Sequence, residues 1–515
     1  MLSGVPMWEI VLHVDARCCG LKKAEVSNKR QIFLRMTRTE LVGAGRLYSR
    51  VTADVLPDDV LLEIFEIYLG KDDADDLDHH PYDGWQRLVH VCHRWRYLVF
   101  LSPRRLDLKL YCTPQRSINS KTLDISGWPE LPIVIDVRDI QSKEDVTNII
   151  AALSQHNRVH KISCRSGQFQ NLLLKEFAAV DKPFLALTTL RLFSSRQNVP
   201  VLPDSFLGRS APLLRSLHLN GIPYPSIGNL LSSTTNLVQL TLCRIPHSGY
   251  ISPETIVPCL PMLVKLKSLA LEFQHPRSRA HRTSRRPPPP TRVFLANLIT
   301  LDFRGDIEYL EDILSQIETP ILNKSRFCFF NQLVFETPLL GQFIRRTKTF
   351  TTIHNARVQF SSLAVGITLS GREEMANNGG NALWLGISCK PLEWQLSAIA
   401  QALNSFLPSL PTLESLEIEI SRGDWQGEIE VVQCREFLHP FTSVTKMTLV
   451  FGDSVRLIAP ALQELAGERA TEVLPALQNI FLRTYNWHPP GPVKEAIEQF
   501  TTMRQVYECP VTAHY

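Results

Sequence analysis

The sequence predicts an α/β protein in which a small all-helical domain is followed by a curved solenoid of parallel strands with helices on the outer face. Three observations predict this fold: two amphipathic helical patterns between residues 56 and 100, a leucine phrase that recurs from residue 187 onward, and helical stretches between its copies. A chain of 515 residues is long enough for several domains or for one extended repeat array. Its 44% hydrophobic and 21% charged residues are ordinary for a soluble protein.

Charge and cysteine usage exclude several classes of function. A formal net charge of +4 gives no electrostatic reason to expect nucleic acid or a membrane as a partner. The 11 cysteines form no C-x-x-C pair, which argues against a disulfide framework and structural zinc and fits a reducing compartment. No stretch approaches the roughly 18 uninterrupted apolar residues of a membrane span, and residues 1–19 make a poor signal peptide. We therefore expect a cytoplasmic or nuclear protein.

The leucine phrase L-x-x-L-x-L predicts the large domain. Its copies begin at Leu187, Leu214, Leu237, Leu266, Leu298, Phe330, Leu413, Val444 and Leu477, with weaker copies near Ile353 and Ala382. Their spacing averages about 29 residues, at the long edge of leucine-rich repeats. The final x-L-x-L of each copy predicts a short strand whose alternate side chains point into a shared core. Any leucine-rich helical protein could contain two such phrases, but nine near one period favour a solenoid.

Helical patterns fill the intervals between the predicted strands. Residues 224–236 form one such stretch, and residues 307–317 form another. The latter carries a single apolar stripe that consists of Ile307, Leu310, Ile313, Leu314 and Ile317. Residues 491–506 begin with Gly-Pro and predict a helix that closes the open end of the array.

The domain organisation follows from these patterns. Residues 1–50 are expected to be a poorly ordered basic leader, residues 51–113 the helical domain, residues 114–490 the solenoid, and residues 491–515 a capping helix and tail. Residues 276–292 contain six Arg and five Pro, which predicts a disordered insertion. It serves either as a basic localisation or docking element or as a solvated loop without a partner.

The helical domain begins with LPDDVLLEIFEIYL at residues 56–69. Pro57 suits the first helical turn, and the two aspartates that follow it complement the helix dipole. Apolar residues then predict one stripe, formed by Val60, Leu61, Ile64, Phe65, Tyr68 and Leu69. After an acidic loop at 70–84, residues 85–100 predict a second helix with a stripe of Leu88, Val91, Cys92, Trp95, Leu98 and Val99. So small a pair of helices gains stability by burying its apolar side chains against a partner.

These two segments resemble an F-box. The resemblance rests on the opening Leu-Pro, the apolar helix after it, and a second helix that carries Val-Cys-x-x-Trp-Arg. The stretches SPRRLDLKLYCT, WPELPIVI, VLPDSFLGRSAPLLRSLHLNGI and IPHSGYISPE are similar to basidiomycete-type fungal F-box proteins with leucine-rich repeats. The likeness covers nearly the whole chain after residue 50. It departs from the family in the inter-helix loop, which is longer and more acidic than in a minimal F-box.

The resemblance implies a substrate-recognition subunit of a cullin-RING ubiquitin ligase of the SCF type. In that family the F-box binds a Skp-type adaptor, and through it a cullin, while the repeats hold an unidentified protein substrate. Carried over by motif, the adaptor-binding residues are Leu56, Pro57, Val60, Leu61, Ile64, Phe65, Leu88, Val91, Cys92, Trp95 and Leu98. The alternative is a leucine-rich-repeat scaffold without a ubiquitin role, in which the same helices cap the array.

No motif for catalysis, cofactor binding or metal binding is present. HExxH, a P-loop and G-x-S-x-G are all missing from the sequence. We therefore expect no catalytic residue, no cofactor and no metal, and any transfer chemistry belongs to partner proteins. An adaptor-binding face predicts partial exposure of Leu61, Phe65 and Leu88, whereas a cap predicts their burial against the first repeats.

Overall fold

The structure is a computed structural model. It describes residues 56–69, 84–113, 130–138, 142–165, 170–195, 199–276, 292–332, 335, 337–371, 382–389, 392–406, 412–420, 431–450, 458, 459, 461–464, 472–483 and 491–514. The leader at 1–50 lies outside the described residues, as do nearly all of the acidic loop at 70–84 and of the Arg/Pro insertion at 276–292. The chain divides into two compact units, Met1–Lys109 and Leu110–Tyr515. The sequence analysis had placed this division after residue 113.

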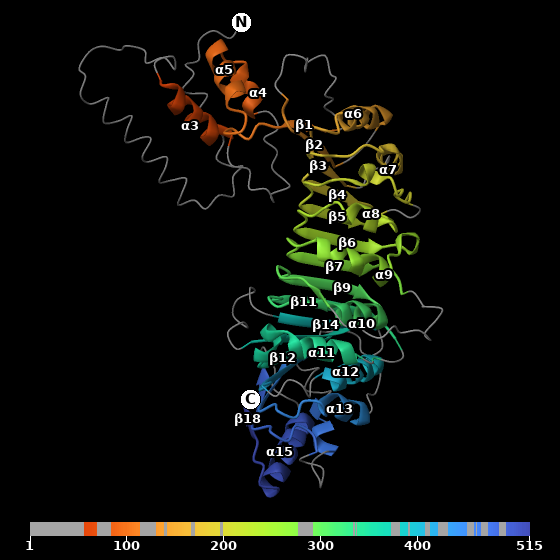
Figure 1. The fold of residues 1–515 in the computed structure, drawn as a ribbon. Helices are drawn as coiled ribbons and strands as arrows, with labels where there is room; N and C mark the ends of the chain where they lie inside the picture. Colours follow the sequence, from red (N-terminus) through yellow and green to blue (C-terminus); the bar gives the residue numbers. More distant parts are fainter. Residues whose placement is uncertain are drawn as a thin grey trace, which may run out of the picture. The chain divides into compact units, whose positions relative to one another are not determined.

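The described part of the first unit is helical (Figure 1). Its helices are α3 (Asp58–Leu69), α4 (Gly84–Val89) and α5 (His93–Leu101). The prediction of one continuous helix over 85–100 is wrong, because the chain breaks between α4 and α5. Cys92 causes the restart: its backbone is extended and its Sγ accepts a hydrogen bond from the Trp95 N–H at 3.5 Å, which caps α5.

The first unit has its own apolar core. Buried side chains come from all three helices and from the segment that follows them, namely Leu61, Leu62, Phe65, Trp85, Leu88, Val89, Leu98, Val99, Leu106 and Leu108. The rings of Phe65 and Trp95 meet edge to face at 4.7 Å between centroids. Trp85 donates a hydrogen bond from Nε1 to the Lys109 carbonyl at 3.0 Å, which ties the end of the unit to α4.

The second unit is a mixed α/β structure built on a large, mostly parallel sheet. Sixteen described strands form this sheet, in the order β1-β2-β3-β4-β5-β6-β7-β9-β11-β14-β13-β12-β15-β16-β17-β18. The strands are β1 (Leu110–Cys112), β2 (Ile133–Val137), β3 (Val159–Cys164), β4 (Thr189–Phe193), β5 (Ser216–Asn220), β6 (Gln239–Ile245), β7 (Ser268–Phe273), β9 (Thr300–Gly305), β11 (Lys324–Phe330), β12 (Asn355–Phe360), β13 (Ala364–Ser370), β14 (Ala382–Ser388), β15 (Ser415–Ile420), β16 (Lys446–Val450), β17 (Asn479–Arg483) and β18 (Thr512–His514). A separate pair joins β8 (Val293–Phe294) to β10 (Ile317–Glu318). The predicted α/β class is therefore confirmed.

Helical segments connect the strands. The α-helices are α6 (Lys143–Leu153), α7 (Gln170–Ala179), α8 (Ile227–Leu231), α9 (Pro253–Ile256), α10 (Ile307–Gln316), α11 (Pro338–Arg346), α12 (Leu392–Phe406), α13 (Val431–Leu438) and α15 (Gly491–Val506). The 3-10 helices are η3 (Phe206–Arg209), η4 (His247–Gly249), η5 (Val257–Met262) and η6 (Lys348–Thr352). In Figure 1 helices α6 to α10 lie along one side of the strands, and α10 to α13 contact their neighbours in sequence. The stripe predicted on 307–317 is buried in α10, as expected.

The leucine phrase explains how successive strands stack. The middle leucines of neighbouring copies lie directly opposite one another across the sheet and are buried, as Leu190, Leu217 and Leu240 show. One carbonyl just before each strand then joins it to the next repeat. For example, the Thr188 carbonyl accepts hydrogen bonds from Arg215 N at 2.8 Å and Ser216 N at 3.1 Å. The same two-donor arrangement recurs along the sheet.

One predicted copy of the phrase has the wrong register. The sequence analysis placed a strand after Phe330, but β11 ends at that residue. The true copy begins at the buried Leu322, and Ser325 occupies the position where the other copies have their middle leucine, opposite Leu301 of β9. Because this copy has a serine where the others have a leucine, the leucine phrase did not identify it.

The prediction that all strands are parallel fails at one place. Strand β13 runs antiparallel to both of its neighbours, β12 and β14, whereas every other described pairing in the sheet is parallel. A tight hairpin produces this reversal, since Ser361 and Ala364 are joined by a hydrogen bond from Ala364 N to Ser361 Oγ at 3.1 Å. Strand β14, which follows β13 in the chain, then pairs with β11. Strands β14 and β13 therefore lie between β11 and β12 in the sheet.

The C-terminal helix lies where the sequence predicts it. Helix α15 spans Gly491–Val506, and its Arg504 is fully buried and donates from Nη2 to the Pro475 carbonyl at 3.0 Å. The sheet does not stop at the repeat before this helix, however. The tail adds strand β18, which pairs in parallel with β17, so the last described strand of the sheet follows the predicted cap.

Candidate functional site

Helix α3 is apolar on two adjacent sectors, of which only one is buried. Leu61, Leu62 and Phe65 form the buried sector. Because successive residues are 100° apart on a helix, Val60, Ile67 and Tyr68 fall on the neighbouring sector, and all three are exposed. The single wide stripe predicted from the sequence is thus two surfaces.

The structure distributes the predicted adaptor-binding residues over three environments. Leu61, Phe65, Leu88 and Leu98 are buried, Leu56, Ile64, Cys92 and Trp95 are half-buried, and Pro57, Val60 and Val91 are exposed. Partial exposure of Leu61, Phe65 and Leu88 was expected for an adaptor-binding face, and this expectation is wrong. The core of the helical unit itself buries them, as the contact of Phe65 with Trp95 shows. Their burial therefore does not separate an adaptor-binding face from a cap.

Sequence reasoning missed the most exposed apolar side chains of this unit. Ile67 is 68% exposed, Leu101 63% and Tyr97 58%. Tyr97 and Leu101 lie one helical turn apart on α5, and Ile67 lies two turns from Val60 on α3. The sequence signal for Ile67 was its spacing of seven residues from Val60, which places both side chains on the same side of α3. The exposed apolar side chains of the helical unit are Val60, Ile67, Tyr68, Val91, Tyr97 and Leu101.

An arginine holds helices α3 and α5 together. Arg94 donates from Nε to Asp58 Oδ1 at 3.0 Å and from Nη2 to the Leu56 carbonyl at 2.6 Å. Both acceptors lie at the start of α3. Because the Asp58 carboxylate is exposed, its ion pair with Arg94 contributes little free energy. The two hydrogen bonds of Arg94 nevertheless hold the start of α3 against α5.

The sheet of the second unit offers a different surface. Side chains alternate along each strand, so Leu383 and Leu385 of β14 are buried in the core while Trp384 points to the other side of the sheet. We call the side opposite the buried leucines the strand face. The strand register places Trp384 of this face directly between Arg326 of β11 and Thr368 of β13.

Charged residues on the strand face are partly paired. Arg357 of β12 contacts Glu417 Oε1 at 2.9 Å and Glu419 Oε2 at 3.3 Å. Towards the other side, Asp302 of β9 lies opposite Arg326. Burial raises the pKa of the Asp302 carboxyl above its ordinary value, against the opposing effect of Arg326. This face therefore combines an aromatic side chain with charges of both signs.

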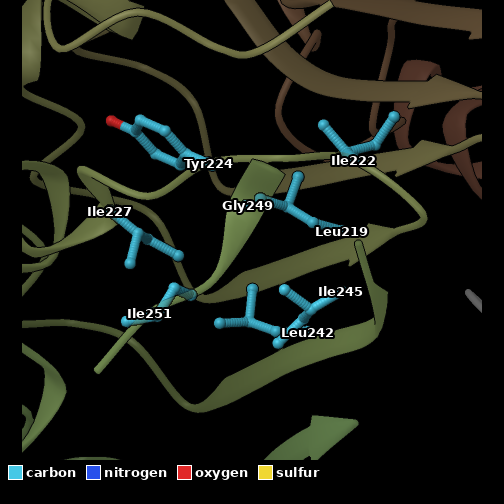
Figure 2. A pocket seen from close by; sticks show the side chains of 8 residues that line it. All are labelled: Leu219, Ile222, Tyr224, Ile227, Leu242, Ile245, Gly249 and Ile251. Carbon is cyan, nitrogen blue, oxygen red and sulfur yellow. The ribbon is translucent and has the colours of Figure 1, made fainter. Parts of the chain in front are cut away.

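A small pocket lies near strands β5 and β6 (Figure 2). Its lining is almost wholly apolar and consists of Leu219, Ile222, Tyr224, Ile227, Leu242, Ile245, Gly249 and Ile251. In Figure 2 the hydroxyl of Tyr224 points away from the other labelled side chains. Among these residues the Tyr224 hydroxyl is the one polar side-chain group.

In the described part of the chain, no three His, Cys, Asp or Glu side chains are grouped so that they could hold a metal ion. Among the helices described, none is both long and apolar enough to cross a membrane.

Comparison with known proteins adds no relative. No protein-family model matches this sequence, and no match is found among curated proteins.

Proposed function

We propose that this chain is an F-box substrate-recognition subunit of an SCF-type cullin-RING ubiquitin ligase. The helical unit is the F-box that binds a Skp-type adaptor, and the sheet unit is a leucine-rich-repeat solenoid that binds the protein to be modified. The observation that carries this proposal is the second apolar sector of α3, which lies uncovered beside a well-formed core.

The energetics of the helical unit support a protein partner. Burial of apolar surface stabilises by about 25 cal/mol per Å², and contiguous exposed apolar side chains typically mark interaction sites. Ile67, Tyr97 and Leu101 are more than half exposed although the same helices bury other residues completely. A partner that covers them gains affinity without disturbing the core that Phe65 and Trp95 form.

The architecture of the second unit supports the repeat interpretation. Successive strands pair in parallel with their leucines in register, and each repeat contacts mainly its neighbours. Such arrays present one long row of side chains per strand position, which suits the recognition of another protein. The SCF assignment itself comes from the F-box resemblance of residues 56–69 and 85–100.

Recovery of the adaptor tests the proposal. The full-length chain is co-expressed with a fungal Skp-type adaptor and purified through a tag on the chain. We expect Ile67→Asp to lower adaptor recovery at least about tenfold, because a charge placed within an apolar contact must be desolvated. The matched control is Val264→Asp, since Val264 is 61% exposed and lies in the sheet unit. It should recover as much adaptor as the wild type.

Both variants change side chains that are already exposed, so both should retain the wild-type circular dichroism spectrum. The proposal is refuted if the wild type recovers no adaptor, or if Ile67→Asp recovers as much as Val264→Asp does.

A further inference from the structure

Trp384 lies flat against the backbone of two strands. A Cβ atom at Gly386 would overlap its indole ring, and one at Gly366 would lie 3.1 Å from Nε1. These two glycines face each other directly across β13 and β14. Gly386 leaves room that any side chain would fill, and Gly366 leaves a close fit, so the ring lies against both glycines on the strand face. We call this ring the platform.

The glycines stand where the sheet departs from its repeat. Glycine weakens a strand because it packs no side chain and loses the most backbone freedom on folding. A directly opposed pair of glycines in the antiparallel insertion β13–β14 therefore costs stability. In return, this pair of glycines leaves the space that the Trp384 ring occupies.

Three cations share the strand face with the ring, and one of them, Arg326, lies over it. The Arg326 guanidinium lies 5.1 Å from the centroid of the Trp384 ring, and Arg304 of β9 lies 5.8 Å from the centroid of Phe330. Lys324 of β11 is exposed, as are both arginines. The strand register places Asp302 opposite Arg326 and Glu272 opposite Arg304. No described carboxylate forms a close ion pair with any of the three cations, in contrast to Arg357, which Glu417 and Glu419 hold.

We propose that this platform, together with Arg326, Arg304 and Lys324, binds an extended acidic segment of the target protein. The identification of the ligand as a target rests on the function proposed above. Guanidinium groups bind carboxylates with two parallel hydrogen bonds, and a flat aromatic ring accommodates proline or an aliphatic side chain.

Strand spacing sets the length of the recognised motif. A segment that crosses the sheet meets β9, β11 and β14 at intervals of about 4.8 Å. Arg304 is in register with Gly386, two residues along β14 from Trp384, so the distance from Arg304 to Trp384 corresponds to about three to four residues of extended chain. A motif with carboxylates two or three residues before a proline satisfies the cations and the ring together.

A single-stranded nucleic acid uses similar groups, since bases stack on aromatic rings and cations bind phosphates. The peptide is favoured because a short segment can place its few carboxylates on the arginines and leave the positions beside Asp302, Glu417 and Glu419 uncharged, whereas a nucleic acid carries a phosphate at every nucleotide. The net charge of +4 for the whole chain points the same way.

Fluorescence anisotropy on the full-length protein tests the proposal. The probes are a fluorescein-labelled dodecapeptide of alternating Glu and Pro, the same peptide with Lys in place of Glu, and a labelled twelve-nucleotide oligouridine. We expect the Glu/Pro peptide to bind at least about tenfold more tightly than the other two, and more weakly when the ionic strength is raised.

Two pairs of variants locate the binding. Trp384→Ala and Arg326→Gln should each weaken Glu/Pro peptide binding about threefold to tenfold. The matched controls are Trp394→Ala, whose side chain is 57% exposed on α12, and Arg345→Gln, which is exposed on α11. Both should bind as the wild type does. Arg326→Glu changes only an exposed charge, so it should fold and should bind the Lys/Pro peptide more tightly than the wild type does.

Equal binding by the wild type, Trp384→Ala and Arg326→Gln overturns the proposal, as does tighter binding of oligouridine than of the Glu/Pro peptide. Adaptor recovery, measured on the same preparations, reports on the proposed function separately. Ile67→Asp should lose the adaptor and keep the peptide, and Trp384→Ala should do the reverse.

Discussion

Replacement of Glu311 by alanine should uncouple two neighbouring repeats. Glu311 of α10 is 1% exposed, and its two carboxylate oxygens accept hydrogen bonds from the first turn of α11, at 3.0 Å from Leu339 N and 2.7 Å from Leu340 N. Thr337, the residue before α11, forms no side-chain cap of its own. A side chain from the preceding repeat thus does the work of a helix cap.

The magnitude follows from the two bonds. Hydrogen bonds to a charged group contribute about 1.5–3 kcal/mol each, and loss of a helix cap costs about 0.5–2 kcal/mol. In Glu311→Ala the buried Leu340 N–H loses the carboxylate, and partial access of water to the space left behind offsets some of the loss. We expect the free energy of unfolding to fall by about 2–4 kcal/mol.

Hydrogen exchange and urea unfolding measure this effect. Exchange of the amides of α11 should accelerate in Glu311→Ala, while the amides of β4 and β5 should keep their wild-type rates, because repeats are stabilised mainly by their neighbours. Glu436→Ala is the control, since Glu436 is exposed on α13. The reasoning is wrong if the two variants differ by less than about 0.5 kcal/mol, the usual range for surface substitutions.

Three other predictions follow from single contacts. Gly221→Ala should destabilise by about 1–3 kcal/mol in thermal unfolding, because Gly221 has a φ of +69° and a Cβ there would overlap the Ser194 carbonyl oxygen; unchanged unfolding would contradict this. Phe65→Ala should cost about 3–5 kcal/mol and make the helical unit sensitive to limited proteolysis, since the ring is fully buried; protease resistance equal to the wild type would count against it. Burial lowers the pKa of His218 from 6.5 to about 4, so the unfolded state binds a proton first and the free energy of unfolding should fall as the pH drops from about 6.5 towards 4. His218→Phe should flatten this dependence in urea titrations at several pH values, and an unchanged slope would exclude His218 as its source.

The repeated strands could be predicted because their signal is redundant. Leu217 and Leu240 are each flanked by further leucines at fixed spacing, so one conservative replacement does not hide the pattern. Ser325 shows the limit: it is buried in the leucine position of β11, and the phrase was then assigned to the next apolar residues. Strand direction was not predictable in the same way. Alternation in β13 is identical whether the strand runs parallel or antiparallel, and only the hairpin at Ser361 decides.

The helical unit shows that apolar periodicity does not predict which part of an amphipathic helix is buried. A stripe of apolar residues identifies α3 as amphipathic, but it does not say which part of a wide stripe a short unit can cover. Phe65 is buried because Trp95 meets it, and Ile67 is exposed because it lies on the far side of that contact. The break before α5 was equally hidden, since Cys92 acts as a cap through a sulfur atom, a role that sequence preferences assign to Ser, Thr, Asp or Asn.

The order of strands at the insertion has a consequence for synthesis on the ribosome. Strands β1 to β11 are added to the sheet in the order in which they are made, except for the small β8 and β10, so each can pair as it emerges. The edge of β11 then waits for β14, about 60 residues later, which takes roughly 3–12 s at usual elongation rates. Meanwhile β12 emerges first, runs in the same direction as β11, and can occupy that edge wrongly. The edge of β11 is therefore open to mispairing between the synthesis of β12 and that of β14.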